Sequence, residues 1–156
     1  MTERGPLYAL FRDEVARHAA ALIAGLRGLE RPGAEPGSAL TLATHSIRGA
    51  ARVVGVAAAE RLAGELEECL SAVERTKAAL GPPAIATLLA GAEALARLGE
   101  VPAGEIDAWV TEHRAGLEAA GAAGVVGGGP AEEILEHRPD QGEGVAVRRP
   151  ALQGED

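Results

Sequence analysis

The sequence predicts an all-α protein built as an antiparallel helical bundle. Aromatic residues make up only 2% of the 156 residues, so the core must consist of Leu, Ile, Val and Ala, which suits closely packed helices. Apolar residues recur at intervals of three and four, and no segment shows the sustained alternation that predicts a β-strand. Five such segments are separated by short Gly- and Pro-containing breaks, as in bundles with short loops.

The first two predicted helices are separated by the run RPGAEPG at Arg31–Gly37. Pro6 suits the first turn of the first helix. The apolar stripe of that helix consists of Leu7, Leu10, Phe11, Val15, His18, Leu22, Leu26 and Leu29. Ser38 is the predicted N-cap of the second helix, which runs to about Val54 and ends at Gly55. Its apolar stripe consists of Leu40, Ala43, Ile47, Ala50 and Val54.

Three further helices follow. The third is expected from about Ala57 to Leu80, with its stripe at Leu62, Leu66, Leu70 and Val73. The run Gly81–Pro83 is a strong break. The fourth helix carries Ile85, Leu88, Leu89, Ala92 and Leu95. After the run GEVPAGE, the fifth carries Ile106, Trp109, Val110, His113 and Leu117.

The composition changes at Gly121, where the run GAAGVVGGGP begins. The residues beyond it are polar and interrupted by Pro and Gly, and only AEEILEH has the pattern of one or two helical turns. We therefore expect residues 1–120 to form the bundle and residues 121–156 to be a flexible Gly/Pro-rich tail or linker.

Composition excludes several classes of function. The net charge is −8 and the pI is near 5.0, whereas a nucleic-acid-binding domain normally has a basic surface. Nucleic acid is therefore not an expected partner.

Cys69 is the only cysteine, so neither an internal disulfide nor a cysteine metal cluster is expected. No two histidines have metal-ligand spacing on one exposed face. Without a leader or a long apolar run, the sequence predicts no membrane association and a cytoplasmic location.

The helical pattern predicts that the side chain of His45 lies on the exposed face of the second helix. With a turn of about 100° per residue, the apolar stripe of the second helix lies roughly opposite His45. Thr41, Arg48, Gly49 and Arg52 lie within roughly 60° of His45 on the exposed face. Of these, we expect Thr41, Gly49 and Arg52 to affect the access of a partner to His45. His18 and His113 instead lie on apolar stripes, so we expect both to be partly buried, and His137 lies in the tail.

This face has the composition of a phosphoryl-accepting site. Gly49 costs about 1 kcal/mol of helix stability relative to alanine, but it clears space one turn from His45. The two arginines would favour a dianion on the imidazole, which is a possible nucleophile. Geometry alone leaves an ordinary surface histidine equally plausible. Glu67 lies at the edge of the third helix's stripe and is a candidate acceptor from Nδ1 of His45, although spacing alone favours a solvated glutamate.

Three segments, LFRDEVARHAAALIAGLRGLE, ATHSIRGAARVVGV and LAGELEECL, resemble the histidine-containing phosphotransfer (HPt) domain. They are most similar to the amino-terminal phosphotransfer module of chemotaxis-type histidine kinases. The central motif is a histidine, two residues, a basic residue and a glycine, which here is His45, Arg48 and Gly49. The resemblance covers about residues 7–118. It implies an antiparallel four-helix bundle with an additional C-terminal helix.

The resemblance also implies roles for individual residues. His45 would be the phosphorylation site, Arg48 would stabilise the charge of the phosphoryl group, and Glu67 would orient the ring of His45. Many members carry a histidine three residues before that glutamate, where this chain has Gly64. This departure predicts a smaller ring-orienting network.

The implied function is that of a phosphorelay intermediate in two-component or chemotaxis-type signalling. His45 would accept a phosphoryl group from a kinase catalytic domain, or exchange it with a receiver-domain aspartate, and Mg²⁺ would be bound by the receiver. No Gly-rich loop followed by lysine is present, so the module would have no ATP site and no cofactor of its own. It is either a separate relay protein or the first module of a larger kinase. The alternative is a helical adaptor that binds a receiver or kinase without being phosphorylated.

Overall fold

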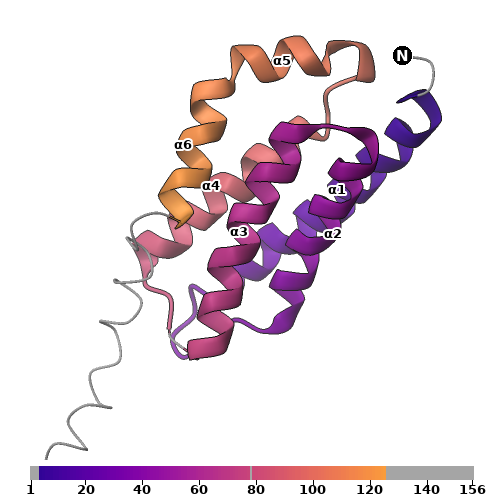
Figure 1. Cartoon of the computed structure of the whole chain (residues 1–156). Helices are drawn as coiled ribbons and strands as arrows, with labels where there is room; N and C mark the ends of the chain where they lie inside the picture. Colours follow the sequence, from indigo (N-terminus) through magenta and orange to yellow (C-terminus); the bar gives the residue numbers. More distant parts are fainter. Residues whose placement is uncertain (1–3, 78, 126–156) are drawn as a thin grey trace, which may run out of the picture.

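The computed structural model describes residues 4–77 and 79–125, and within them every regular element is helical. Figure 1 shows how the helices are arranged. They are α1 (Arg4–Gly28), α2 (Ser38–Val54), α3 (Ala57–Thr76), α4 (Pro82–Leu98), the short 3₁₀ helix η1 (Ala103–Glu105), α5 (Ile106–Glu112) and α6 (Arg114–Val125). The predicted all-α fold is confirmed.

Helices α1 to α4 form the bundle. Helix α2 packs between α1 and α3, and α4 packs against α1 and, less extensively, against α3. After α4, η1 and α5 cross one end of the bundle, and α6 then runs along α3 and α4 (Figure 1). The predicted four-helix bundle is therefore confirmed, and the additional C-terminal helix predicted after it is present as α5 and α6.

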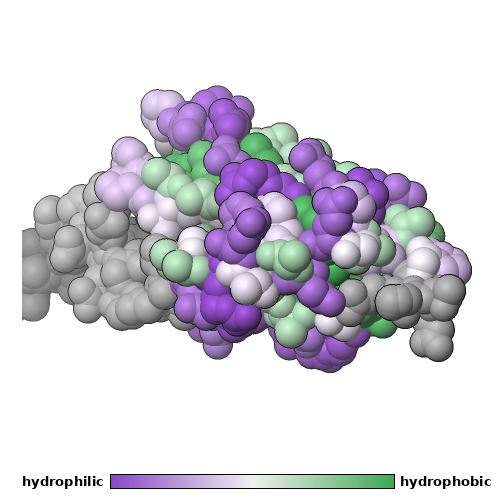
Figure 2. All heavy atoms as spheres, turned by 90° about the horizontal axis from the view of Figure 1, so that it is seen from above, coloured by the Kyte–Doolittle hydropathy of each residue, from purple (hydrophilic) through white to green (hydrophobic). Residues whose placement is uncertain are grey.

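Small and aliphatic side chains fill the core, as the composition predicts. The largest fully buried side chains are Tyr8, Phe11, Leu22, Leu26, Ile47, Leu62, Leu66, Leu70, Leu88, Leu95, Leu98 and Ile106. The surface in Figure 2 is mostly hydrophilic, and hydrophobic positions form separate small areas on it. Burial of these side chains stabilises the fold by roughly 1.5–3 kcal/mol for each large aliphatic residue.

The apolar stripe of α1 differs from the predicted one at its N-terminal end. Leu7 and Leu10 are 46% and 59% exposed, whereas Tyr8 is only 2% exposed. Tyr8 continues the spacing of Phe11 and Val15, and its hydroxyl donates a hydrogen bond of 3.0 Å to the carbonyl oxygen of Val101. The aromatic ring thus takes the core position because a buried acceptor satisfies its hydroxyl group.

Two predicted helix boundaries are wrong by a few residues. Gly37, not Ser38, is the N-cap of α2, and no side chain caps this end. Helix α3 ends at Thr76 and not at Leu80, and Lys77 has a left-handed backbone with φ of 58°. Pro82 begins α4, and a residue before proline is disfavoured in the helical region. The left-handed Lys77 thus ends α3, and the extended Gly81 before Pro82 leads the chain into α4.

The predicted fifth helix is two helices, with α5 ending at Glu112 and α6 beginning at Arg114. Helix α6 continues to Val125, five residues beyond the predicted boundary at residue 120. The remainder of the predicted tail, including AEEILEH, lies outside the described residues. Among the helices that the structure describes, none is long and apolar enough to cross a membrane.

Gly99 provides a test of the core packing. A Cβ at this position would lie 2.6 Å from Cγ1 and 3.1 Å from Cβ of Val15, a fully buried residue with a stiff side chain. We expect Gly99→Ala to lower the free energy of unfolding by about 1–3 kcal/mol through overpacking. The matched control is Gly116→Ala in α6, where no atom lies within 4 Å. That substitution should stabilise the protein by up to about 1 kcal/mol. Equal melting temperatures for the two variants would contradict the packing described here.

Candidate functional site

His45 lies in the middle of α2 and points away from the core. Its side chain is 66% exposed, whereas Ala43 and Ile47, two residues to either side, are buried. Thr44 and Ala51 are also buried, although the predicted stripe omits them, and Ala50 is only partly buried. The outward direction of His45 agrees with the sequence-based prediction.

A glutamate of the neighbouring helix fixes the His45 ring. Nδ1 of His45 lies 3.0 Å from Oε2 of Glu67 in α3. A carboxylate oxygen only accepts hydrogen bonds, so Nδ1 carries the proton in this contact. Nε2 of the neutral imidazole is then left with its lone pair available. The Glu67 side chain is only 17% exposed, so the carboxylate that contacts this exposed ring is itself largely buried.

Arg48 uses the other oxygen of the same carboxylate. Nη1 of Arg48 donates to Oε1 of Glu67 at 2.8 Å. Glu67 therefore has one partner on each oxygen, and both come from α2. Gly64 adds no side chain to this network, in which Arg48 supplies the second contact to Glu67.

Two further contacts join the same helices on either side of Glu67. Nε of Arg52 donates to Oε2 of Glu60 at 2.7 Å, and Oγ1 of Thr41 donates to Oε1 of Glu74 at 3.1 Å. The three glutamates follow one another at intervals of seven residues along α3, which keeps them on one side of that helix. Glu60 and Glu74 were not predicted as part of this surface, although their interval of seven residues from Glu67 is the signal that identifies them.

The other side of His45 is open and apolar. A Cβ at Gly49 would have no heavy atom within 4 Å, so the space predicted there is present. Leu42 and Val53 are 61% and 66% exposed. By the helical turn angle, these three positions lie about 40–80° from His45 on the side opposite Arg48. His45 thus separates a charged side, paired with α3, from an exposed apolar side.

The lone cysteine does not offer a second nucleophile. Burial raises the pKa of the Cys69 thiol above its usual value, which disfavours the reactive thiolate. Among the described residues, no group of His, Cys, Asp and Glu side chains is arranged to hold a metal ion.

Of the two other described histidines, one agrees with the sequence-based expectation and one does not. His18 is partly buried, and its Nε2 lies 3.0 Å from Oε1 of Glu14. His113 is exposed rather than buried, because α5 ends at Glu112 and the apolar stripe does not continue through it. Its ring stacks on Trp109 at a centroid distance of 4.0 Å, and its Nδ1 donates to the Trp109 carbonyl oxygen at 2.8 Å.

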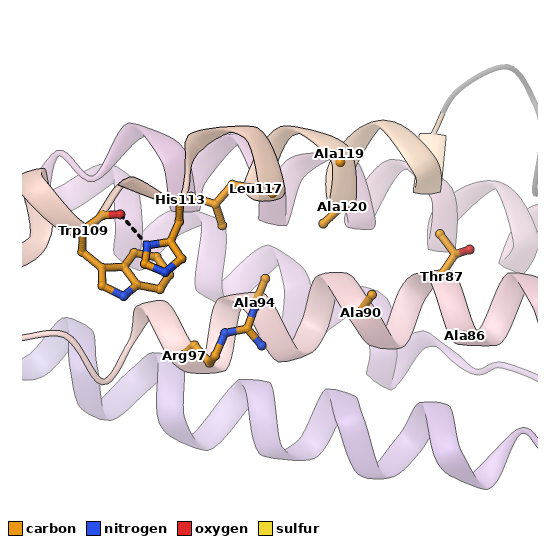
Figure 3. A pocket seen from close by; sticks show the side chains of 11 residues that line it. Ala86, Thr87, Ala90, Ala94, Arg97, Trp109, His113, Leu117, Ala119 and Ala120 are labelled. Carbon is orange, nitrogen blue, oxygen red and sulfur yellow. Dashed lines mark hydrogen bonds between the residues drawn. The ribbon is translucent and has the colours of Figure 1, made fainter. Parts of the chain in front are cut away.

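Figure 3 shows His113 and Trp109 at one end of a groove between α4 and α6. The groove has a volume of about 490 Å³, and its lining includes Ala86, Ala90, Ala94, Ala119 and Ala120. His45, Arg48 and Glu67 are not among its lining residues. The groove is therefore separate from the His45 cluster.

A comparison with protein-family models matches the chain to the Hpt domain between residues 6 and 103. The matched range holds nearly all of α1 and the whole of α2 to α4, including His45 and Glu67, and it spans more than half of the chain. The chain belongs to the Hpt domain family. Histidine phosphotransfer in a phosphorelay is the role that this family implies, and Hpt domains in general interact with receiver domains and kinases. No curated protein and no solved structure matches the chain.

The ring contacts predict a defined tautomer for two histidines. At a pH where the imidazoles are neutral, His45 and His113 should both carry the proton on Nδ1, because each Nδ1 faces an oxygen acceptor. Long-range ¹H–¹⁵N NMR spectra distinguish the two tautomers. Glu67→Ala should shift His45 toward the tautomer mixture of an unpaired imidazole and leave His113 unchanged. A His45 spectrum that does not respond would show that Glu67 does not hold the ring.

Proposed function

We propose that this Hpt domain accepts a phosphoryl group on Nε2 of His45 and exchanges it with an aspartate of a receiver domain. The observation that carries the proposal is the exposed imidazole whose Nδ1 is held by Glu67 at 3.0 Å. This contact leaves the nucleophilic lone pair on Nε2, the ring nitrogen farther from α3. The similarity of the segments around His45 and Glu67 to the amino-terminal module of chemotaxis-type kinases favours such a module, for which a kinase catalytic domain would be the first phosphoryl donor.

The transfer step makes one bond and breaks one bond. The Nε2 lone pair attacks the phosphorus of the aspartyl phosphate, the N–P bond forms, the P–O bond to the aspartate breaks, and the carboxylate leaves with the bonding electrons. The imidazole becomes positively charged as the N–P bond forms. Glu67, hydrogen-bonded to Nδ1–H, stabilises that charge. The reverse reaction uses the same contacts.

Arg48 and Arg52 supply positive charge near the transferred group, although each is paired with a glutamate of α3. Phosphoryl transfer depends mainly on positioning and on charge stabilisation. The receiver would contribute Mg²⁺ to that stabilisation, and no cofactor is assigned to this chain. Thr41 holds its position on the face through Glu74 and has no proposed role in the chemistry.

The apolar side of His45 supports docking of the receiver there. Leu42 and Val53 are exposed on either side of Gly49 along α2. Exposed large apolar side chains beside a reactive group are typical of a surface that a partner covers. A receiver that covers this side would approach Nε2 without disturbing the contacts between α2 and α3.

The phosphoacceptor assignment is tested by His45→Gln. Incubation with a receiver domain phosphorylated on its aspartate, or with a phosphoramidate donor, should place an acid-labile label on the wild-type protein. The variant should take up no label, since the nucleophile is gone. Its helicity and melting temperature should stay close to wild type, because the side chain is largely exposed.

One control variant accompanies this test, and two results would count against the proposal. His113→Gln should keep full labelling, since that exposed ring lies by the α4/α6 groove and not at the Glu67 site. Label retained in His45→Gln would contradict the assignment. A wild-type protein that binds the receiver but never takes up label would instead favour the alternative function, an adaptor that is not phosphorylated.

Gly49 should matter for partner access and not for folding. Gly49→Ala should stabilise the isolated domain by up to about 1 kcal/mol through helix propensity. Gly49→Gln should also fold, because the position faces open space. Both should slow transfer from a receiver, glutamine more than alanine, since each side chain occupies space one turn from the ring. Melting temperatures and single-turnover transfer rates measure the two effects.

A small phosphoramidate donor separates access from reactivity. It needs less room than a receiver domain, so Gly49→Gln should reduce its rate less than the receiver rate. Receiver transfer at the wild-type rate in Gly49→Gln would contradict the access role of Gly49. Unfolding of both variants would contradict the exposed position of Gly49 in α2.

A further inference from the structure

The surroundings of Gly64 in α3 explain how Arg48 reaches Glu67. Gly64 lies one helical turn before Glu67. A Cβ built at Gly64 would lie 3.5 Å from Cδ and 3.7 Å from Nε of Arg48. The Arg48 side chain therefore passes directly over this position before its Nη1 donates to Oε1 of Glu67.

We propose that Gly64 helps to position Glu67, because its lack of a side chain lets Arg48 lie across α3. Arg48 then holds one oxygen of Glu67, and the other oxygen is fixed on Nδ1 of His45. Gly64 and Arg48 are positioning residues, since the contact to the ring is made by Glu67. The positioning of Glu67 by Arg48 is inferred from the contacts alone. The effect of Gly64 on phosphoryl transfer rests in addition on the proposed function of His45.

Side-chain freedom explains why the second contact matters. A glutamate side chain has three rotatable bonds and loses conformational entropy when it is fixed. One contact to an exposed imidazole leaves the carboxylate free to turn about that contact. A second contact from Arg48, whose side chain is 39% exposed and therefore partly shielded from water, holds both oxygens together and keeps Oε2 directed at Nδ1.

The distances at Gly64 define how large a side chain this position accepts. At 3.5 Å, a single added methyl group makes ordinary van der Waals contact with Arg48. Valine adds two γ-carbons to the same Cβ, and its stiff χ1 prevents both from turning away. Gly64→Ala should therefore leave the Arg48–Glu67 contact in place, whereas Gly64→Val should displace Arg48.

The test uses Gly64→Ala, Gly64→Val, Arg48→Ala and the double variant Gly64→Val/Arg48→Ala. The first readout is the His45 tautomer by ¹H–¹⁵N NMR, which requires no phosphorylation. The spectrum of Gly64→Ala should match wild type. In Gly64→Val and in Arg48→Ala, His45 should shift toward the tautomer mixture of an unpaired imidazole. The double variant should be no different from Arg48→Ala, because a substitution that acts only through Arg48 has no effect once Arg48 is removed.

The second readout is the rate of phosphoryl transfer to His45. Gly64→Val and Arg48→Ala should each slow it by roughly two- to fivefold, which corresponds to the modest strength of a partly exposed ion pair. Gly116→Val is the matched control for placing valine on an exposed helical position, since nothing lies within 4 Å of Gly116. It should change neither the tautomer nor the rate.

Three results would overturn the inference. The first is a wild-type His45 tautomer in folded Gly64→Val. The second is a Gly64→Val effect that persists undiminished in the Arg48→Ala background. The third, decisive even where Gly64→Val does not fold, is a wild-type tautomer in Arg48→Ala. If the tautomer responds as expected but His45 takes up no phosphate, the positioning role stands and only the proposed function fails.

Discussion

The register between α2 and α3 is the constraint on which the site depends. A shift of one residue along either helix would rotate its side chains by about 100° and separate Glu67 from His45. Buried aliphatic residues, among them Ile47 in α2 and Leu66 in α3, set this register. Each such side chain contributes roughly 1.5–3 kcal/mol, whereas an exposed ion pair contributes about 0–1 kcal/mol. The core therefore aligns the helices, and the polar contacts follow from that alignment.

Given this register, the polar residues of α2 meet the acidic residues of α3 at regular steps. Thr41 contacts Glu74, His45 and Arg48 share Glu67, and Arg52 contacts Glu60. The main consequence of these contacts is orientation and not stability. They hold the charged side of His45 in place and leave the opposite side, with Leu42, Gly49 and Val53, to solvent. One helix thus presents a fixed surface and an accessible surface on either side of the same imidazole.

Helix periodicity was sufficient to predict the helical bundle and the outward direction of His45, because both follow from which residues must be buried. It was not sufficient for His113, since the end of α5 depends on how the chain crosses the bundle. It also placed Leu7 and Leu10 in the core, where Tyr8 lies instead, because the Val101 carbonyl that satisfies the tyrosine hydroxyl is distant in sequence. Spacing within one helix could not pair Glu67 with His45, since that contact requires the relative position of two helices.

Local charge balance accounts for how the proposed site could both accept and release a phosphoryl group. With a neutral imidazole, the single charges of Arg48 and Glu67 cancel, as do those of Arg52 and Glu60. The sequence as a whole carries a net charge of −8. A phosphoryl dianion on His45 would therefore lie near two arginines whose charges are already balanced by glutamates of α3. Strong stabilisation of the phosphorylated state would make the transfer difficult to reverse. Paired arginines keep that stabilisation modest, and the partner must then supply most of the positive charge at the moment of transfer.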